Sequence, residues 1–365
     1  MVEWKKLGEV CSIKRGNRVT KSDLIENGKF PVISGGVNPL GYIDKYNREP
    51  NTITIAQYGS AGYIDLQKGR FWANDVCYSL YPNRCVSNMF LYYSLKNRQK
   101  DIYSLRTNAV PAHLPQKELS EVVIPIPSLA EQERIVGILD TFTASIDNLK
   151  EQIAQRRKQY EYYRDQLLDL EGKEGVEMKT LGEICDTLSG FPFDSSKFSE
   201  DGIRLMRGMN VKRGYFDFSV ENNKYWKSAD GLEKYLLESN DIIISMDGSL
   251  VGRSFCYLTS KHLPMLLVQR VARVRTKENY KYIYFNICQR FPDYVDKKKT
   301  AGAIPHISMK DINNFIIPIP SLSEQERIVS ILATFESSIQ NLEAQLKERQ
   351  KQYEYYRNKL LTFGE

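Results

Sequence analysis

One stretch of 45 residues occurs twice in this chain and decides its architecture. Residues 124–168 read IPIPSLAEQERIVGILDTFTASIDNLKEQIAQRRKQYEYYRDQLL, and residues 317–361 read IPIPSLSEQERIVSILATFESSIQNLEAQLKERQKQYEYYRNKLL. Without a gap, 31 of the 45 positions carry the same residue. Identity on this scale indicates a duplicated structural unit.

Weaker repeats surround the strong one and extend the duplication to the whole chain. VEWKKLGEVCSIKRG at 2–16 matches VEMKTLGEICDTLSG at 176–190, and the segment at 107–119 matches that at 300–312. The second match pairs His113 with His306, for which we expect a structural role in hydrogen bonding. The repeats predict four parts: a head at 1–127, a long helix at 128–170, a second head at 171–320 and a second long helix at 321–365.

Each long segment opens with the signature of a helix start. A serine is followed three residues later by a glutamate, as Ser128 by Glu131 and Ser321 by Glu324. This spacing predicts a capping box, in which hydroxyl and carboxylate bind the first free N–H groups. Apolar residues then recur at alternating spacings of four and three, which is a heptad seam broken once in each copy, at Arg156 and Arg349.

Connectivity predicts how the two helices pair. Forty helical residues span about 60 Å, and such a seam needs a partner, for which the other copy is the obvious choice. Only residues 169–176 separate the first helix from the second head, so a helix leaving that head must run back antiparallel to the first. The predicted fold is α+β: two globular mixed α/β heads held apart by an antiparallel two-helix coiled coil, with pseudo-two-fold internal symmetry. The alternative is two independent helices, each packed on its own head.

The heads combine short strands with polar, glycine-containing loops. β-Branched or aromatic runs predict strands at 52–56, 75–80, 241–245, 253–258 and 268–274. Arg and Lys suit guanine edges and phosphates, and Asn and Gln suit adenine edges. The loop residues that we expect to bind DNA are Lys14, Arg15, Asn17, Arg18, Gln57, Tyr58, Ser60, Arg106, Asn108, Arg204, Arg207, Asn210, Lys212, Arg213, Ser249 and Arg253.

The amino-acid composition is compatible with a protein that binds DNA. The net charge of +6 and the pI near 8.8 suit an acidic partner. Six scattered cysteines, none in a Cys-x-x-Cys pair, predict reduced thiols in a cytoplasmic protein. No long apolar run or signal peptide is present in the sequence, so we expect no membrane contact.

The repeated motif closely resembles the repeats of specificity subunits of type I restriction–modification systems. The residues that carry the resemblance are Ile124-Pro125-Ile126-Pro127-Ser128-Leu129-x-Glu131-Gln132-Glu133-Arg134-Ile135 and the same pattern at 317–328. Looser matches occur at 242–252 and 207–211. The resemblance implies two target recognition domains, each of which reads one half of a bipartite site in double-stranded DNA.

The resemblance also implies partners that supply the chemistry. The helices would dock two methyltransferase subunits, which use S-adenosylmethionine to methylate adenine, and motor and nuclease subunits would add ATP-dependent cleavage. The implied partner-interface residues are Glu131, Gln132, Arg134, Tyr162, Glu324, Gln325, Arg327 and Tyr355.

The sequence contains no motif that predicts catalysis by this chain itself. It has no Asn-Pro-Pro-Tyr methyltransferase motif and no Gly-x-x-x-x-Gly-Lys phosphate loop, and no metal site or cofactor is expected. Two alternatives stay open at this point. One is a coiled-coil scaffold that binds proteins but not DNA, and the other is an enzyme whose site is hidden in the sequence.

Overall fold

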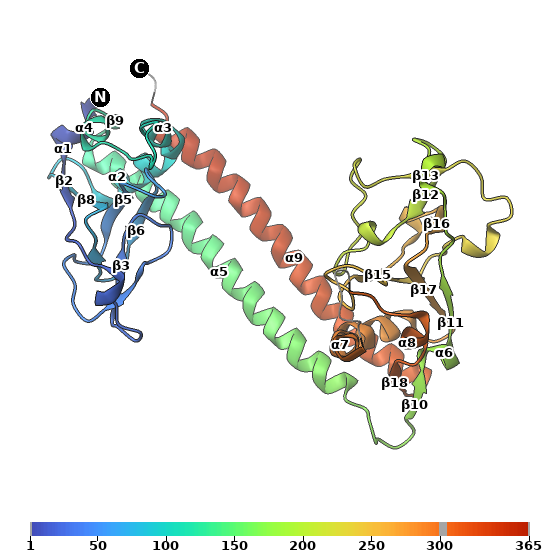
Figure 1. Cartoon of the computed structure of the whole chain (residues 1–365). Helices are drawn as coiled ribbons and strands as arrows, with labels where there is room; N and C mark the ends of the chain where they lie inside the picture. The colour runs from blue at the N-terminus through green and yellow to red at the C-terminus, as the bar shows by residue number, and fades with distance from the viewer. Residues whose placement is uncertain (1, 299–304, 364–365) are drawn as a thin grey trace. The chain divides into compact units, whose positions relative to one another are not determined.

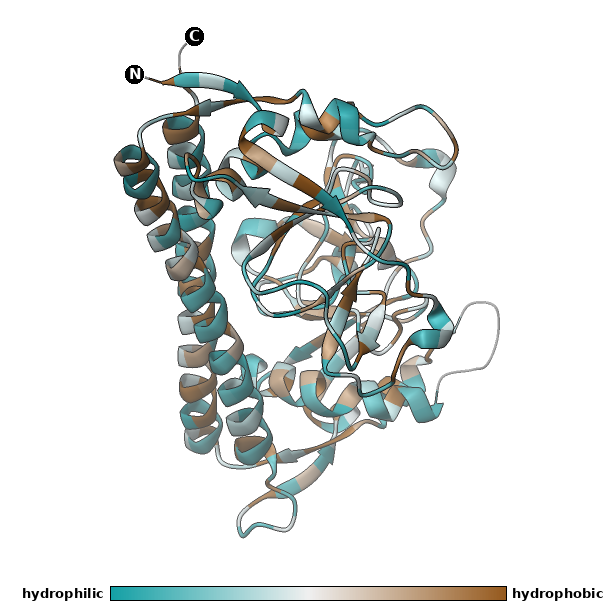
Figure 2. Cartoon of the chain, turned by 90° about the vertical axis from the view of Figure 1, so that its left-hand side faces the viewer, coloured by the Kyte–Doolittle hydropathy of each residue, from teal (hydrophilic) through white to brown (hydrophobic). Residues whose placement is uncertain are grey.

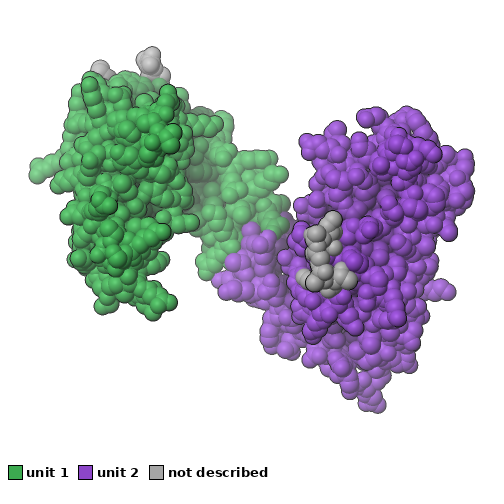
Figure 3. All heavy atoms as spheres, in the orientation of Figure 1, with its two compact units in different colours: residues 1–152, 342–365 green, residues 153–341 purple. Residues whose placement is uncertain are grey.

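The computed structural model describes residues 2–298 and 305–363 and contains two compact units. Unit 1 comprises residues 1–152 and 342–365, and unit 2 comprises residues 153–341 (Figure 3). Each unit contains one head together with part of both long helices. The first five residues of the weak repeat at 300–312 lie outside the described part of the chain.

The head of unit 1 is built on nine short strands (Figure 1). A four-stranded antiparallel sheet has the order β2-β8-β5-β6, and a three-stranded sheet has the order β4-β3-β7, in which β3 and β7 are parallel. A two-stranded ribbon joins β1 and β9. The strands are β1 (Glu3–Lys6), β2 (Cys11–Arg15), β3 (Phe30–Ile33), β4 (Gly41–Ile43), β5 (Thr52–Ala56), β6 (Ile64–Gln67), β7 (Trp72–Ala73), β8 (Cys77–Pro82) and β9 (Val123–Ile126).

The head of unit 2 repeats this plan strand for strand. Its sheets have the orders β11-β17-β14-β15 and β13-β12-β16, and its ribbon joins β10 and β18. Divergent sequences therefore adopt one topology in the two heads. The strands are β10 (Glu177–Thr180), β11 (Cys185–Ser189), β12 (Ile203–Met206), β13 (Tyr225–Trp226), β14 (Ile242–Ser245), β15 (Phe255–Tyr257), β16 (Met265–Leu267), β17 (Val271–Thr276) and β18 (Ile316–Ile319).

Short helices complete each head and cover one face of its larger sheet. Buried residues of the sheet, of these helices and of the start of a long helix form one apolar cluster in each unit. The cluster extends to Ile135 and Leu139 in unit 1 and to Ile328 and Leu332 in unit 2, so each head is packed onto its long helix. The short helices are α1 (Leu7–Val10), α2 (Asn88–Asn97), α3 (Gln99–Ser104), α4 (Gln116–Ser120), α6 (Leu181–Ile184), α7 (Tyr280–Lys298) and α8 (Met309–Asn313).

Two helices of 40 residues, α5 (Leu129–Leu168) and α9 (Leu322–Leu361), carry the strong repeat. In unit 1 the ring of Phe142 stacks on Tyr356, with centroids 5.3 Å apart, and in unit 2 Tyr163 stacks on Phe335 at 5.4 Å. The early part of one helix thus meets the late part of the other, so the pair is antiparallel. Figure 2 shows apolar residues recurring along both helices, as their spacing predicts.

These contacts confirm the predicted fold class and exclude the alternative of two independent helices. Each predicted strand region overlaps an observed strand, and β5 has the predicted bounds, whereas β8 and β17 each end two residues later than predicted. Only one of the two hydrogen bonds of the predicted capping box is present. Ser128 accepts a hydrogen bond from the N–H of Glu131 at 3.4 Å, but the carboxylate of Glu131 binds Arg134 instead of the cap.

Candidate nucleic-acid interface and helix surfaces

In head 1 the structure brings together three polar loops, at 34–36, 57–62 and 106–113, and the last of them contains His113. Its ring stacks on Tyr58, with centroids 5.2 Å apart, and its Nδ1 lies 3.0 Å from the hydroxyl of Thr107. The N–H of Ser60 donates to the carbonyl of Gly35 at 2.7 Å. The loops at 34–36, 57–62 and 106–113 therefore form one surface.

Glycine allows two of these loops to approach each other closely. A Cβ on Gly35 would lie 2.5 Å from the carbonyl oxygen of Tyr58, which no side chain tolerates. Gly59 adopts φ 68°, in the region that favours glycine. Glycine is therefore required at these positions by the close packing of the loops.

The basic segment at the end of β2 lies beside this surface. Lys14, Arg15, Asn17 and Arg18 are exposed. The guanidinium of Arg15 lies 5.8 Å from the ring centre of Tyr78, whose hydroxyl donates to the carbonyl of Leu114, the residue directly after the third loop. The segment is therefore linked to the loop cluster through Tyr78.

The remaining predicted residues of head 1 differ in accessibility. Gln57 is 3% exposed, so its side chain does not reach the surface, whereas Asn108 is exposed. Arg106 is also exposed and lies 5.0 Å from the ring centre of Tyr103. Arg106 and Asn108 line an open cavity of about 510 Å³.

Head 2 repeats this arrangement around Asp247 and His306. These residues form an isolated bridge equivalent to that of Tyr58 and His113 in head 1. The N–H of Gly248 donates to the carbonyl of Pro305 at 3.1 Å, and a Cβ on Gly208 would lie 3.4 Å from an Asp247 carboxylate oxygen. The loop that begins at Met246 thus lies against the segment at 305–307, and the loop that begins at Arg207 lies close to Asp247.

Several predicted side chains of head 2 have partners within the head. Arg207 lies over the ring of Phe198 at 5.6 Å, and Arg204 lies over Phe218 at 4.9 Å. Arg253 makes a bidentate ion pair with Asp296, at 2.6 and 3.1 Å. Lys212 lies 3.9 Å from the carboxylate of Asp217.

Asn210 does not fit its predicted role in DNA contact. It is fully buried, its Oδ1 accepts from the N–H of Arg207, and its Nδ2 donates to the carbonyls of Asp217 and Asn222. Every hydrogen-bonding group of this amide is used inside the loop. By contrast, Arg213 and Ser249 are exposed.

Sequence reasoning missed Arg270. It lies in the turn between β16 and β17 at φ 64°, its side chain is 66% exposed, and its Nη1 lies 3.6 Å from the Asp247 carboxylate. No motif marks this turn in the sequence. Only the close approach of Asp247 in space makes Arg270 a candidate.

Gln132 and Gln325 were expected at a partner interface, but both are fully buried. The Nε2 of Gln132 donates to the carbonyls of Cys85 and Pro127, and its Oε1 accepts from the N–H of Ser87. Gln325 makes the equivalent bonds to Pro320 and Asn279. The amide of the repeated motif therefore joins each long helix to the start of α2 or α7, and it is not available to a partner.

The other predicted interface residues are accessible. Arg134 binds the carboxylate of Glu131 through two bonds of 2.7 Å, and Arg327 binds Glu324 in the same way. Each arginine lowers the pKa of its glutamate below the ordinary value through these hydrogen bonds. Tyr162 and Tyr355 are each 60% exposed, at equivalent positions of the two helices.

Neither a metal cluster nor a membrane span is found in the part of the chain that the structure describes. No three His, Cys, Asp or Glu side chains of residues 2–298 and 305–363 lie where they could hold a metal ion. Within the same residues, no helix is both long and apolar enough to cross a bilayer.

Comparison with known proteins agrees with this architecture over the whole chain. The family model for the type I restriction modification DNA specificity domain matches residues 1–156 and 173–351. The specificity subunit of the type I restriction enzyme EcoR124I/EcoR124II of Escherichia coli is 32% identical, over 99% of this chain and 94% of that protein. The MjaVIII specificity subunit of Methanocaldococcus jannaschii is 25% identical, over 92% of this chain and 86% of that protein.

A solved structure shows the same fold. The crystal structure of a type I restriction-modification S subunit from M. genitalium matches with a TM-score of 0.70 and 21% identity, over 100% of this chain and 97% of that one. The fold of this chain is thus shared, over its whole length, with a solved structure. The chain therefore belongs to the type I restriction–modification specificity family, and it is the DNA specificity subunit, the non-catalytic component, of such a system.

Proposed function

We propose that each head reads one half of a bipartite site in double-stranded DNA, and that α5 and α9 dock two methyltransferase subunits. The observation that carries this proposal is the contrast between the two parts of the repeat. The strong repeat that contains the helices keeps 31 of 45 residues, whereas the heads keep their topology but differ in their loops. Shared helices suit one kind of partner bound twice, and divergent loops suit two different half-sites.

The loop cluster of each head is the proposed DNA-reading surface. In head 1 it combines the exposed cations Lys14, Arg15 and Arg18 with Tyr58 and Ser60, which lie on tightly packed glycine loops. Cations bind phosphates and guanine edges, and glycine loops let backbone N–H groups approach phosphates. In head 2 we add Arg270 to Arg207, Arg213, Ser249 and Arg253, and we remove Asn210 because its amide is fully used.

The proposed methyltransferase surface is the exposed side of α5 and α9. Tyr162 and Tyr355 are equally exposed at equivalent positions late in the two helices, and the ion pairs of Glu131 with Arg134 and of Glu324 with Arg327 lie near the helix starts. Exposed Tyr and Arg side chains are frequent energetic centres of protein interfaces. In this proposal the bound subunits methylate adenine, and motor and nuclease subunits join them in the full complex.

Exchange of one head tests the proposal. Replacing residues 2–123 with the head of a related protein should change one half of the methylated site, as measured by methylome sequencing of cells that express the matching methyltransferase. The matched control replaces residues 177–316 and should change only the other half. A simultaneous change of both halves by either exchange would show that the heads do not read independently.

A further inference from the structure

The β1–β9 and β10–β18 ribbons each expose apolar side chains at equivalent positions. In unit 1 Trp4 is 42% exposed and Val123 is 40% exposed. In unit 2 Met178 is 42% exposed and Ile316 is 50% exposed. Trp4 and Met178 occupy the same strand position, opposite Pro125 and Pro318, and Val123 and Ile316 both begin the second strand. We call these two sets the unit 1 pair and the unit 2 pair.

This exposure runs against the pattern expected for such a ribbon. An antiparallel pair that buries one face usually presents polar residues on the other. Here the buried face is supplied by Ile124 and Ile126, and by Ile317 and Ile319, all at 8% exposure or less. Both ribbons nevertheless carry large apolar residues on the outside. The side chains differ between the repeats, but their apolar character is retained.

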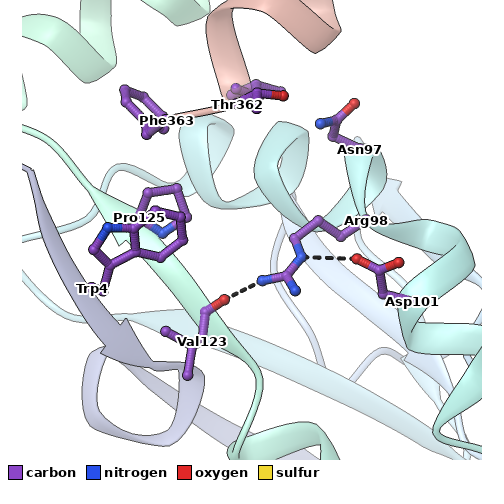
Figure 4. Close-up of a pocket in the computed structure, with 9 residues that line it drawn as sticks. Trp4, Asn97, Arg98, Asp101, Val123, Pro125, Thr362 and Phe363 are labelled. Carbon is purple, nitrogen blue, oxygen red and sulfur yellow. Dashed lines mark hydrogen bonds and ion pairs between the residues drawn. The ribbon is translucent and has the colours of Figure 1, made fainter. Parts of the chain in front are cut away.

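In unit 1 the pair borders a cavity of about 710 Å³ (Figure 4). Trp4 lies beside Pro125 on one wall, Phe363 lies on another, and Arg98 reaches across to the carbonyl of Val123. The Nε of Arg98 also lies 3.1 Å from the Asp101 carboxylate, which fixes the guanidinium in place. Trp and Arg are among the residue types that dominate binding energy at protein interfaces, and Phe is enriched at interfaces.

We propose that the unit 1 pair and the unit 2 pair are docking sites for the methyltransferase subunits, one subunit at each ribbon, in addition to the helix surface. The inference rests on the proposed function, because it takes its partner from there. We assign methyltransferase subunits to these sites because the exposed apolar pair is repeated in the two units. A surface present once in each repeat fits a partner that binds once to each repeat, whereas DNA half-sites that differ would not require the same apolar feature twice.

A stoichiometry measurement tests the proposal. Full-length chain is mixed with its cognate methyltransferase subunit, and the mass of the complex is measured by native mass spectrometry and light scattering over a titration. The variants are the unit 1 double substitution Trp4→Glu with Val123→Glu, the unit 2 double substitution Met178→Glu with Ile316→Glu, and the combination of all four. The matched controls are Val37→Glu and Val220→Glu, which change exposed apolar residues away from the ribbons, one in each unit.

The parent and the controls should bind two subunits. Each double variant should bind one subunit as before and the other at least tenfold more weakly, and the combined variant should bind both weakly. Two subunits bound with parental affinity by the double variants would overturn the inference. If circular dichroism shows that a double variant is unfolded, the milder Trp4→Gln and Met178→Gln substitutions replace it, with the same loss expected in smaller degree.

Two other outcomes separate this inference from its premises. A parent chain that binds DNA but no methyltransferase subunit would refute the proposed partner and the inference together. A parent chain that dimerises alone, with monomeric double variants, would show that the ribbons pair with a second copy of the chain, which also overturns the inference.

Discussion

Asn210 and Arg213 stand three residues apart in one loop of head 2, but their side chains have different environments. The amide of Asn210 binds three backbone groups and is fully buried, whereas Arg213 is exposed. A residue type that suits adenine recognition can equally hold a loop in shape. The distinction depends on which backbone groups come within hydrogen-bond distance, and that is not encoded in residue type.

Substitution at these two positions should therefore have separable effects. Asn210→Ala leaves three buried backbone groups without this partner, so we expect a loss of about 1–3 kcal/mol in the free energy of unfolding. Arg213→Ala should leave unfolding unchanged and weaken DNA binding by about 1–3 kcal/mol. Chemical denaturation and DNA titration at fixed salt measure the two quantities. Equal unfolding curves for both variants would contradict the assignment.

Glu336 of α9 is a second residue whose effect depends on its surroundings. The equivalent position in the first copy of the repeat is occupied by Thr143. Burial raises the pKa of Glu336, while the charge of Lys281 and a hydrogen bond from Tyr160 oppose this shift. An acid whose pKa is raised in the folded state binds protons more tightly there than in the unfolded chain. Its contribution to stability is therefore lost as pH rises above the ordinary carboxyl pKa.

We expect Glu336→Gln to raise the unfolding temperature at neutral pH, with a difference that shrinks toward pH 4. Thermal unfolding between pH 4 and pH 8 measures the effect, and Glu326→Gln, at an exposed position of the same helix, is the matched control. A variant less stable than the parent at pH 7 would show that the carboxylate is stabilising in its ionised form.

At the scale of the element, contacts between the two long helices account for the apolar seam and for its interruptions. The arginines that interrupt the seam lie over aromatic rings of the other helix, Arg156 at 5.8 Å from Phe335 and Arg349 at 5.7 Å from Phe142. The heptad pattern is thus continued by cation–π contact at these positions. The seam and its exceptions are both consequences of the antiparallel pairing.

The buried glutamines give the element-scale prediction. Gln132→Ala removes partners from the N–H of Ser87 and from two carbonyls, so we expect a loss of about 1–3 kcal/mol in stability, and the same for Gln325→Ala. Glu133→Ala, at the adjacent exposed position, is the control. If Gln132→Ala weakens methyltransferase binding without any change in unfolding, then the glutamine does belong to the partner interface.

At the scale of the whole molecule, both long helices run without interruption from one unit into the other. Residues 152 and 153 lie within α5, and residues 341 and 342 lie within α9. We predict that these helices set the spacing between the two half-sites in the DNA. This prediction can be tested because the seam has a fixed heptad period.

Insertion of one heptad after Ile153 and another after Leu346 should lengthen the preferred spacer. Seven helical residues add about 10.5 Å, which corresponds to about three base pairs at about 3.4 Å each. We expect loss of the parental site and weaker binding to sites with spacers longer by about two to four base pairs, because the added turn of the duplex must be absorbed. Binding to a series of spacers measures this.

The control for the heptad insertion lengthens the chain outside the helices. Seven Gly and Ser residues placed between Gly172 and Lys173 leave α5 and α9 unchanged, so the spacer preference should not move. Unchanged preference in the folded heptad variant as well would show that the helices do not set the distance.

The sequence by itself determined the duplication, the antiparallel helix pair and five strands of the larger sheets, β5, β8, β14, β15 and β17. The duplication and the helix pair follow from identity and periodicity within residues 124–168 and 317–361, and the five strands follow from β-branched and aromatic runs in the heads. It also located polar loops such as 57–62 and 106–108, because glycine and polar residues mark turns in any fold.

Only the tertiary structure decided which polar residues are accessible. Gln132, Gln325 and Asn210 look like surface residues in the sequence, but they satisfy buried backbone groups that other segments bring to them. The proximity of Arg270 to Asp247 and the exposed apolar residues of the two ribbons also follow only from the tertiary structure. Whether a side chain meets water or another segment depends on contacts between residues far apart in the chain, and residue type and spacing carry no record of those contacts.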